Sequence, residues 1–288
     1  MLGAIGFLGF GEAAQTFAGD ARWRGPAQGY DRQTDSPALA EAKSAEFALL
    51  GVRKCSSSRE AVADAGIILS LVTADQAGVA ARDAALHIVE GALYLDMNSV
   101  APATKKAAAA AIGARGGLYV DAAIMSPVKP AALDAPILLS GPAAEAAETV
   151  LCSLGFTSVR SVGAEVGRAS LIKMVRSVLI KGIEAVTAEC LLAAHAGGVV
   201  DEVLASLGES WRKQADYNLE RVLVHGVRRA AEMEEVAHTL RDLGVKPRMT
   251  EGAVAWQSEI GALGLNPAPV ALHDKLHSVA VVQTAAVA

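Results

Sequence analysis

The sequence lacks most of the features that mark disulfide-rich or metal-binding proteins. Its 288 residues include only three cysteines, an odd number, at the widely separated positions Cys55, Cys152 and Cys190. None of them has the spacing of a metal-ligand pair, so we expect free thiols and no metal site. Reduced, unpaired cysteines are typical of the cytoplasm, which is the compartment we expect for this chain.

Long hydrophobic runs and an excess of positive charge are also missing. No apolar stretch approaches the length of a membrane span, and no basic segment precedes the apolar start, which argues against a signal peptide. The formal net charge is −5, so no basic field attracts nucleic acid or an anionic membrane. Hydrophobic residues make up 52% of the chain and aromatic residues 4%, which fits a globular protein with two domains or one large domain.

The most informative stretch is the beginning of the chain, where an apolar run is followed by small residues. Residues 4–8 have the pattern of a buried strand, and Gly9, Gly11 and Ala14 form a G-x-G-x-x-A at the start of a helix. These small residues allow a tight turn, close approach of a pyrophosphate and close packing of helix on strand. The first amides of the helix would face the phosphates. The pattern predicts a dinucleotide site; an ordinary glycine turn is the alternative.

A second segment supports the dinucleotide site. Residues 28–32 (QGYDR) have the pattern of a strand end, about 20 residues after the glycines, where an acidic residue accepts hydrogen bonds from ribose hydroxyls. Asp31 favours NAD because its charge repels the 2'-phosphate of NADP. Arg32, with Thr34 beside it, could instead hold that phosphate. We therefore expect NAD or NADP as cofactor, with the preference open.

The first part of the chain alternates between apolar runs of strand length and helical segments. Besides those already named, the expected strands lie at 66–72, 92–97, 118–121, 137–140 and 158–162, and the expected helices at 36–50, 56–65, 75–90, 102–113 and 143–154. Apolar runs alternating with helices indicate a mainly parallel sheet with helices on both faces. We predict an α/β Rossmann domain with a doubly wound sheet over residues 1–163. Strand-like runs then disappear, which predicts an all-α domain over residues 164–288.

The helix predicted from Gly167 to His195 has an unusual distribution of side chains. Apolar residues cover much of its circumference, which is typical of a buried central helix. Unpaired charge is costly to bury, so polar residues on such a helix need water, partners or a ligand, unless they face solvent. At about 100° per residue, the polar residues fall within an arc of roughly 80°. They are Ser170, Lys173, Ser177, Lys181 and Glu184.

Two later segments are less informative. Residues 227–243 form an amphipathic pattern that predicts a helix with a solvated or subunit-facing charged side. Nearby, His225, Arg228 and Arg229 could reach a negatively charged substrate, but surface charge is the simpler interpretation. The segment beyond Pro269 is apolar enough to pack on this subunit or on a partner subunit.

Several segments together resemble the β-hydroxyacid dehydrogenase superfamily, the relatives of 6-phosphogluconate and 3-hydroxyisobutyrate dehydrogenase. GFLGFG (6–11) is similar to the family's G-x-I-G-L-G, and DMNSVAP (96–102) to its D-x-S-T-x-x-P. VDAAIMSP (120–127) stands where the family has D-A-P-V-S-G-G, and Lys173 lies in the helix that resembles the one with the catalytic lysine. HGVRRAAEM (225–233) resembles a subgroup whose substrates are poorly assigned.

The resemblance implies an NAD(P)-dependent oxidoreductase that moves a hydride between nicotinamide and a hydroxy acid or related carbonyl compound. It implies that Lys173 is the general acid/base, with a pKa lowered by partial burial beside Lys181. A cleft between the domains and a homodimer built by the helical domain are also implied. Substrate contacts are expected for Asn98, Ser99, Ser126, Ser177 and Lys181. Cofactor contacts are expected for Gly9, Phe10, Gly11, Glu12, Ala13, Asp31, Arg32, Val72, Thr73 and Asn98.

Two departures from the family pattern concern the substrate. The family places asparagine one helical turn after its lysine, where this chain has Arg176 and Ser177. Met125-Ser126-Pro127 replaces the S-G-G that binds a substrate carboxylate, which removes one backbone amide. The general chemistry tolerates both changes, whereas a small 3-hydroxy-acid substrate is supported only weakly.

Two other functions fit the same scaffold. An imine reductase is one alternative, although those relatives often carry aspartate or tyrosine where Lys173 stands. A cofactor-binding module without catalysis is another, although such a protein has no need for a lysine stripe facing the nicotinamide. The residues favour the dehydrogenase.

Overall fold

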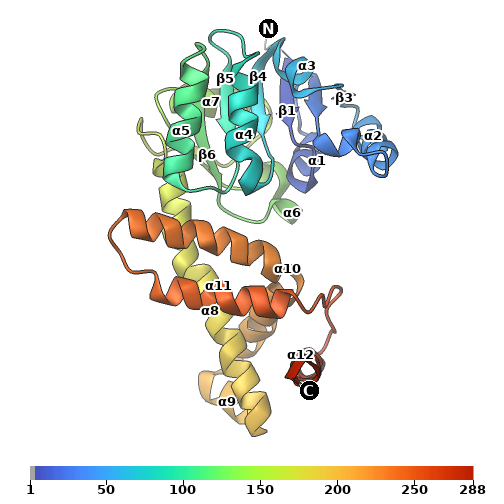
Figure 1. The fold of residues 1–288 in the computed structure, drawn as a ribbon, viewed down its shortest axis with the longest axis vertical. Helices are drawn as coiled ribbons and strands as arrows, with labels where there is room; N and C mark the ends of the chain where they lie inside the picture. Colours follow the sequence, from blue (N-terminus) through green and yellow to red (C-terminus); the bar gives the residue numbers. More distant parts are fainter. Residues whose placement is uncertain (1–3, 288) are drawn as a thin grey trace. The chain divides into compact units, whose positions relative to one another are not determined.

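The computed structural model describes residues 4–287, with side chains described up to residue 281. The chain divides into two compact units, Met1–Lys173 and Met174–Ala288 (Figure 1). The predicted fold class is confirmed, because all strands precede a series of long helices. The predicted domain boundary at residue 163 lies shortly before the division between the units and stays a prediction. Within the described residues, no helix is long and apolar enough to cross a membrane.

The first unit is built on an eight-stranded sheet with the order β3-β2-β1-β4-β5-β6-β7-β8. Neighbouring strands pair in parallel, except that β6 and β7 are antiparallel. The progression of strands reverses between β1 and β4, and ligands bind at the carboxyl ends of strands at such a switch point. The strands are β1 (Ala4–Leu8), β2 (Ala27–Tyr30), β3 (Arg53–Lys54), β4 (Ala65–Ser70), β5 (Leu93–Asp96), β6 (Leu118–Ile124), β7 (Ile137–Ser140) and β8 (Val159–Ser161).

Helices cover both faces of this sheet, because alternate strand residues point to opposite sides. Leu69 and Leu95 pack with α1, α2 and α7, whereas Ile68 and Tyr94 pack with α3, α4 and α5. Figure 1 shows α4 and α5 side by side over one face. The helices are α1 (Glu12–Ala18), α2 (Ala40–Leu49), α3 (Ser58–Val62), α4 (Ala74–Ala85), α5 (Pro102–Gly113), α6 (Val128–Ala131) and α7 (Ala144–Ser153), with short 3-10 helices η1 (Arg32–Asp35) and η2 (Ala132–Asp134).

Three of these helices are shorter than the sequence predicts, and the one expected over 56–65 is only Ser58–Val62. The helix expected from residue 36 begins only at Ala40, because Ser36 opens a turn in which its carbonyl accepts the amide of Leu39. The helix expected to reach residue 90 ends at Ala85, where the chain turns back through Gly91, at φ +78°, into β5.

The second unit contains only helices among its described residues. They are α8 (Arg168–Gly197), whose first turns belong to the first unit, and α9 (Val200–Leu207), α10 (Glu209–Asp242), α11 (Arg248–Gly261) and α12 (Leu272–Val287). The helix predicted over 227–243 is therefore only the second half of α10. Its first half was missed, although Ala215, Leu219 and Val222 there have helical spacing and face the core.

The helices α10 and α11 cross in direct backbone contact at two glycines. A Cβ at Gly226 would lie 2.3 Å from the carbonyl oxygen of Gln257 and 2.7 Å from the Cα of Gly261. Real Cβ atoms do not approach other atoms this closely, so the glycine of the HGVRR segment has a packing role.

We expect Gly226→Ala to lower the free energy of unfolding by about 1–3 kcal/mol, the usual cost of forcing extra atoms into a packed contact. Gly252→Ala is the matched control, because a Cβ at Gly252, in α11, meets no atom within 4 Å. This second change should stabilise the protein by up to about 1 kcal/mol, since alanine is the better helix former. Urea unfolding measures both, and an unchanged midpoint for Gly226→Ala would contradict the crossing described here.

Candidate active site

The glycine turn after β1 has room for a ligand. Gly9 adopts φ +83°, and a Cβ there would lie 2.5 Å from the carbonyl oxygen of Leu71, so the position requires glycine. A Cβ at Gly11 would meet no described atom within 4 Å. Gly11 also precedes α1, and no side chain in the described part of the chain caps this helix. The amides of Glu12 and Ala13, at the start of the helix, can therefore serve an anion in that space.

The residue between the two glycines is fixed from several sides. The Phe10 amide donates to the Asp31 carboxylate at 2.7 Å, and its carbonyl accepts from Gln15 at 2.8 Å and from Lys43 at 3.2 Å. Its ring is fully buried and stacks on Phe47 with the ring centroids 4.0 Å apart. Phe10 therefore shapes the turn from inside the domain, and its contact with the cofactor stays a prediction.

Asp31 ends β2 at the predicted place. One of its carboxylate oxygens holds the Phe10 amide, and the other accepts from the amide of Gln33 at 2.9 Å. Each carboxylate oxygen can accept more than one hydrogen bond, so Asp31 can still bind hydroxyl groups. Arg32 follows in η1 and is exposed. The predicted Val72 and Thr73 follow β4, and Thr73 is the residue that precedes α4.

Asn98 follows β5 and has an unsatisfied acceptor. Its side-chain amide nitrogen donates to Ser70 Oγ at 3.0 Å and to Asp96 Oδ1 at 2.7 Å. Its Oδ1 is buried and has no hydrogen-bond partner among the described residues. A buried acceptor without a partner costs about 1–3 kcal/mol, so this atom fits a site where a ligand supplies the donor. Together with the open space at Gly11, it meets the requirements of a dinucleotide site.

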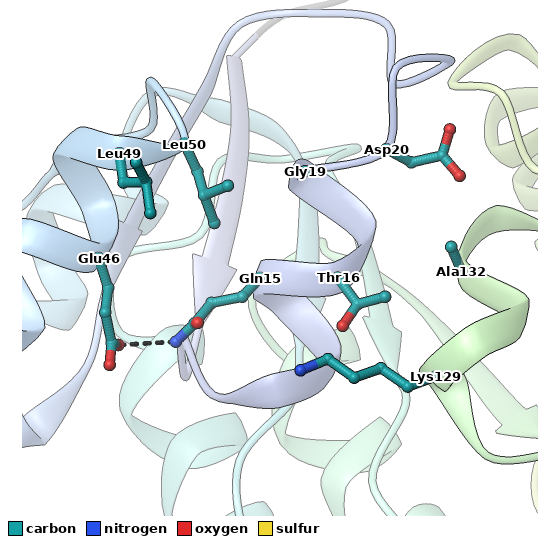
Figure 2. A pocket seen from close by; sticks show the side chains of 9 residues that line it. All are labelled: Gln15, Thr16, Gly19, Asp20, Glu46, Leu49, Leu50, Lys129 and Ala132. Atoms are coloured by element: carbon teal, nitrogen blue, oxygen red, sulfur yellow. Dashed lines mark hydrogen bonds between the residues drawn. The ribbon is translucent and has the colours of Figure 1, made fainter.

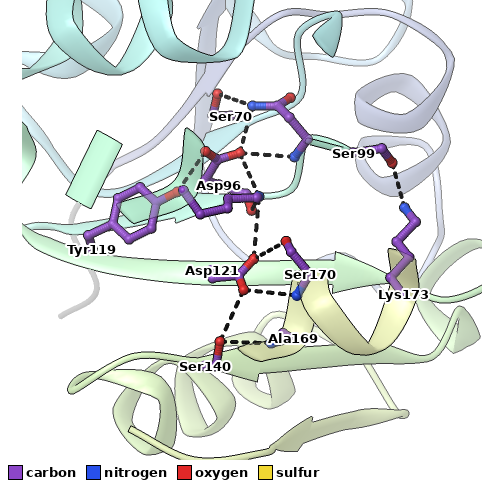
Figure 3. A network of polar contacts seen from close by, with 11 residues as sticks. Ser70, Asp96, Ser99, Tyr119, Asp121, Ser140, Ala169, Ser170 and Lys173 are labelled. Carbon is purple, nitrogen blue, oxygen red and sulfur yellow. Dashed lines mark hydrogen bonds and ion pairs between the residues drawn. The ribbon is translucent and has the colours of Figure 1, made fainter. Parts of the chain in front are cut away.

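The side chains of Lys173 and Ser99 are in direct contact. The ammonium of Lys173, in the second turn of α8, donates to the hydroxyl of Ser99 at 2.6 Å, and Figure 3 shows the two side chains pointing toward one another. Both residues are partly exposed. Ser126 lies on the loop after β6, where its hydroxyl donates to the carbonyl of Pro127 at 3.2 Å.

A buried polar network lies beneath these residues, and the sequence analysis did not identify it. Its central cation is Lys105, from α5, which contacts Asp96 at 2.9 Å and Asp121 at 3.4 Å with all three side chains fully buried. Two aspartates that each end an apolar run were the available signal. Lys105 itself gave none, because it lies beside Lys106 in an alanine-rich helix where both could be solvated.

The remaining residues of the predicted polar arc of α8, Ser177, Lys181 and Glu184, are partnered or buried rather than solvated. Ser177 is 7% exposed, and Lys181 pairs with Glu232 at 2.6 Å. Burial lowers the pKa of Lys181, which its ion pair with Glu232 partly offsets. Glu184 pairs with Arg229, and both are buried. The surface role preferred for Arg229 is therefore wrong, because a buried carboxylate on α8 neutralises it.

The apolar side of α8 also differs from the prediction of a buried central helix. Val175 is 48% exposed, Leu179 64% and Val186 50%. At about 100° per residue these three fall on one face of the helix. The prediction of a buried central helix is therefore wrong for this face, which none of the elements among residues 4–281 covers.

A separate hollow of about 430 Å³ lies between α1, α2 and the segment around α6 (Figure 2). Gln15 crosses it and donates to the Glu46 carboxylate at 2.6 Å. None of the predicted site residues lines this hollow, so it is distinct from the candidate site.

Comparison with known proteins identifies the family. Residues 4–163 match the NAD binding domain of 6-phosphogluconate dehydrogenase, and residues 194–260 match a domain of unknown function, DUF1932. A conserved hypothetical protein from Sinorhizobium meliloti 1021 is 36% identical, with 97% of this chain and 96% of that chain covered and a TM-score of 0.75.

Two further solved structures are similar. A conserved protein of unknown function, reported to resemble 3-hydroxyacid dehydrogenases, is 32% identical over 92% of this chain and 100% of that chain, with a TM-score of 0.70. The 3-hydroxyisobutyrate dehydrogenase of Mycobacterium tuberculosis shares the fold at 19% identity over 99% of each chain, with a TM-score of 0.71. With more than half of its length in the first match, the chain belongs to the 6-phosphogluconate dehydrogenase-like superfamily of NAD(P)-dependent oxidoreductases, the β-hydroxyacid dehydrogenases.

Proposed function

We propose that the protein is a dehydrogenase that interconverts a hydroxy acid, or a related alcohol, and the corresponding carbonyl compound. The observation that carries the proposal is the 2.6 Å hydrogen bond between Lys173 and Ser99. The residue before Ser99, Asn98, has a buried side-chain oxygen without a partner in the described residues. An ammonium group held at the loop that follows β5, with an unsatisfied acceptor in the same loop, suits the reduction of a carbonyl group.

The residues that would hold the cofactor follow four strands, β1, β2, β4 and β5. Gly9, Gly11 and the first amides of α1 would hold the pyrophosphate, and Asp31 the adenosine ribose. Val72 and Thr73, after β4, would flank the nicotinamide ribose. When bound, the nicotinamide supplies or takes up the hydride. Asn98 would accept a hydrogen bond from the cofactor or the substrate through Oδ1, since its amide nitrogen already donates twice.

Lys173 would handle the proton. Its ammonium stabilises negative charge that develops on the substrate oxygen and donates a proton to it during reduction; in the reverse direction the neutral amine accepts that proton. Ser99 accepts a hydrogen bond from this ammonium and so restrains the position of Nζ. Ser126 would contact the substrate. Contacts from Ser177 and Lys181 stay predictions, and Lys181 already holds Glu232.

The catalytic activity of the Lys173→Ala variant tests this assignment. The wild-type protein is first assayed with reduced cofactor against a panel of keto acids, other carbonyl compounds and cyclic imines. For the carbonyl substrate found, we expect kcat of Lys173→Ala to fall by about 10²–10⁴-fold, the usual contribution of a general acid/base. Cofactor affinity should be unchanged, because the lysine acts on the substrate oxygen.

Lys106→Ala is the matched control, since Lys106 is exposed and pairs only with an exposed glutamate, Glu165. Turnover retained in Lys173→Ala would remove this lysine from the mechanism. Turnover of cyclic imines alone would favour the imine reductase, and tight cofactor binding without any turnover would favour the non-catalytic module.

We also propose that NAD is preferred over NADP. The end of β2 carries Asp31 and Asp35, with only Arg32 as a cation between them in the sequence. Burial, the hydrogen bond to Asp35 and the charges of both aspartates raise the pKa of Tyr30 to about 12, which Arg32 only partly opposes. Two carboxylates and one guanidinium stand in residues 31–35, and this excess of negative charge disfavours a 2'-phosphate.

Calorimetric titration with NADH and NADPH measures the preference. We expect NADH to bind at least about tenfold more tightly, because a like-charge contact costs about 1–4 kcal/mol near a protein surface. Asp31→Asn should reduce the ratio of NADH affinity to NADPH affinity. Asp64→Asn should leave this ratio unchanged, because Asp64 is exposed and lies beyond α3. Gly11→Trp should abolish binding of both by filling the open space at the turn. Tighter binding of NADPH would reverse the proposed preference.

We further propose that the exposed apolar face of α8 is the contact surface of a homodimer. Val175, Leu179 and Val186 form an apolar stripe that water would otherwise cover, and such a stripe on one helix face is suited to a second copy.

Sedimentation velocity tests this surface. We expect the wild type to sediment as a dimer or larger symmetric oligomer and Leu179→Glu as a monomer, because a charge would be buried at the contact. Val270→Glu is the control, since Val270 is 94% exposed in the loop before α12. A wild-type monomer, or an oligomer unaffected by Leu179→Glu, would exclude this surface.

A further inference from the structure

Four polar side chains form a row across the middle of the sheet in the first unit. Ser70 pairs in register with Asp96, Asp96 with Asp121, and Asp121 with Ser140, on the neighbouring strands β4, β5, β6 and β7. The row interrupts an otherwise apolar sheet face, on which side chains such as Ile68 pack against α3, α4 and α5 to form a core. A row of this kind is costly to bury unless every member is paired.

Lys105 provides the central pairing. Its ammonium contacts the Asp96 carboxylate at 2.9 Å, the Asp96 carbonyl oxygen at 2.6 Å and the Asp121 carboxylate at 3.4 Å. All three side chains have no exposed surface. The cation therefore joins the end of β5 to the middle of β6, and these two positions support different parts of the candidate active site.

Asp121 fixes the start of α8. Its carboxylate accepts the Ser170 amide at 2.9 Å and the Ser170 hydroxyl at 2.6 Å. Ser140 accepts the preceding amide, that of Ala169, at 3.0 Å, and Figure 3 shows these groups together. A carboxylate at the first amides of a long helix is favourable because the helix dipole is positive there. Lys173 follows Ser170 by one turn, so Asp121 sets the height and rotation of Lys173.

Asp96 fixes the loop on the other side of Lys173. Its Oδ1 accepts the Asn98 backbone amide at 3.0 Å and the Asn98 side-chain amide at 2.7 Å. Its Oδ2 accepts from the Tyr119 hydroxyl at 2.7 Å, and burial beside Asp96 raises the pKa of Tyr119, which keeps it a donor. Ser99 comes next in the chain and accepts from Lys173.

These contacts close a ring. It runs from Lys173 through Ser99 and Asn98 to Asp96, then through Lys105 and Asp121 to Ser170, and back along one turn of α8. Lys105 contacts both Asp96 and Asp121 and so joins the two halves of the ring through side chains, in addition to the backbone pairing of β5 with β6. It touches neither Lys173 nor Ser99 in the contacts of the described residues, so any effect on them passes through Asp96 and Asp121.

We propose that Lys105 is a positioning residue, which holds the Asn98–Ser99 loop and the first turns of α8 at the separation that Lys173 needs. The catalytic part of this inference rests on the function proposed above, whereas the positioning itself does not. Breaking the Lys105 contacts should loosen both segments locally and leave the rest of the sheet unchanged.

Lys105→Met tests the proposal, because it keeps the length of the side chain and removes its charge. Amide hydrogen exchange, read by mass spectrometry in the full-length protein, should become faster at residues 97–101 and 168–173 and stay unchanged in β1, β2 and α1. The kcat for the wild-type substrate should fall on the order of 100-fold, the cost of a misplacement of about 1 Å, with the cofactor Kd unchanged. Lys106→Met, at the exposed neighbouring lysine, should behave as the wild type.

Asp121→Asn is the second variant, chosen because it leaves Lys105 and Asp96 as a neutral pair. It should loosen residues 168–173 and leave residues 97–101 protected, and it tests the ring even if Lys105→Met fails to fold. Unchanged exchange in both segments, or an even loss of protection throughout the sheet, would overturn the positioning role. Local loosening in a protein that turns over no compound of the panel would support the positioning role and reject the proposed dehydrogenase.

Discussion

The buried charge pairing of Lys105 with Asp96 and Asp121 is the constraint on which the candidate site depends. Removing one partner from such a group leaves a charge without compensation, which costs about 3–5 kcal/mol. The three residues come from α5, β5 and β6, so their contacts fix the end of β5, the middle of β6 and one helix with respect to each other. The first amide of α8 to contact Asp121, that of Ser170, adds a second favourable partner to this carboxylate besides Lys105. Strand ends, Asn98 and Lys173 take their positions from this arrangement.

The glycine turn is the second constraint, and it is of a different kind. At Gly9 the backbone lies so close to Leu71 that any side chain would collide with it, whereas at Gly11 the space is open. The first glycine therefore serves the fold and the second leaves room for a ligand. Asp31 contributes to both the fold and the ligand site, because it accepts the Phe10 amide and can still accept hydrogen bonds from a ligand. The same few residues therefore decide how closely the chain after β1 approaches the chain after β4, and whether a dinucleotide can reach the turn.

Much of the first unit could be predicted from the sequence because its signals are local. Continuous apolar runs mark β4 and β5, Pro102 marks the start of α5, and the small residues after β1 mark the turn. What failed depends on partners distant in the sequence. From the sequence alone Lys105 is expected to be solvated, whereas in the structure it contacts two aspartates of the sheet. Arg229 looks exposed until α8 supplies Glu184. The exposed face of α8 carries the apolar pattern of a buried helix, since a pattern does not say which molecule covers it.

The central claim is that hydride passes between nicotinamide and a carbon that carries oxygen, and an isotopic label tests it most directly. Reduced cofactor with deuterium at the transferring position is incubated with the protein and the panel of carbonyl compounds and imines, and the products are analysed by mass spectrometry and NMR. The account predicts that deuterium appears on a carbon bearing a hydroxyl group. Deuterium only on a carbon bearing nitrogen, or deuterium that never leaves the cofactor, would contradict it.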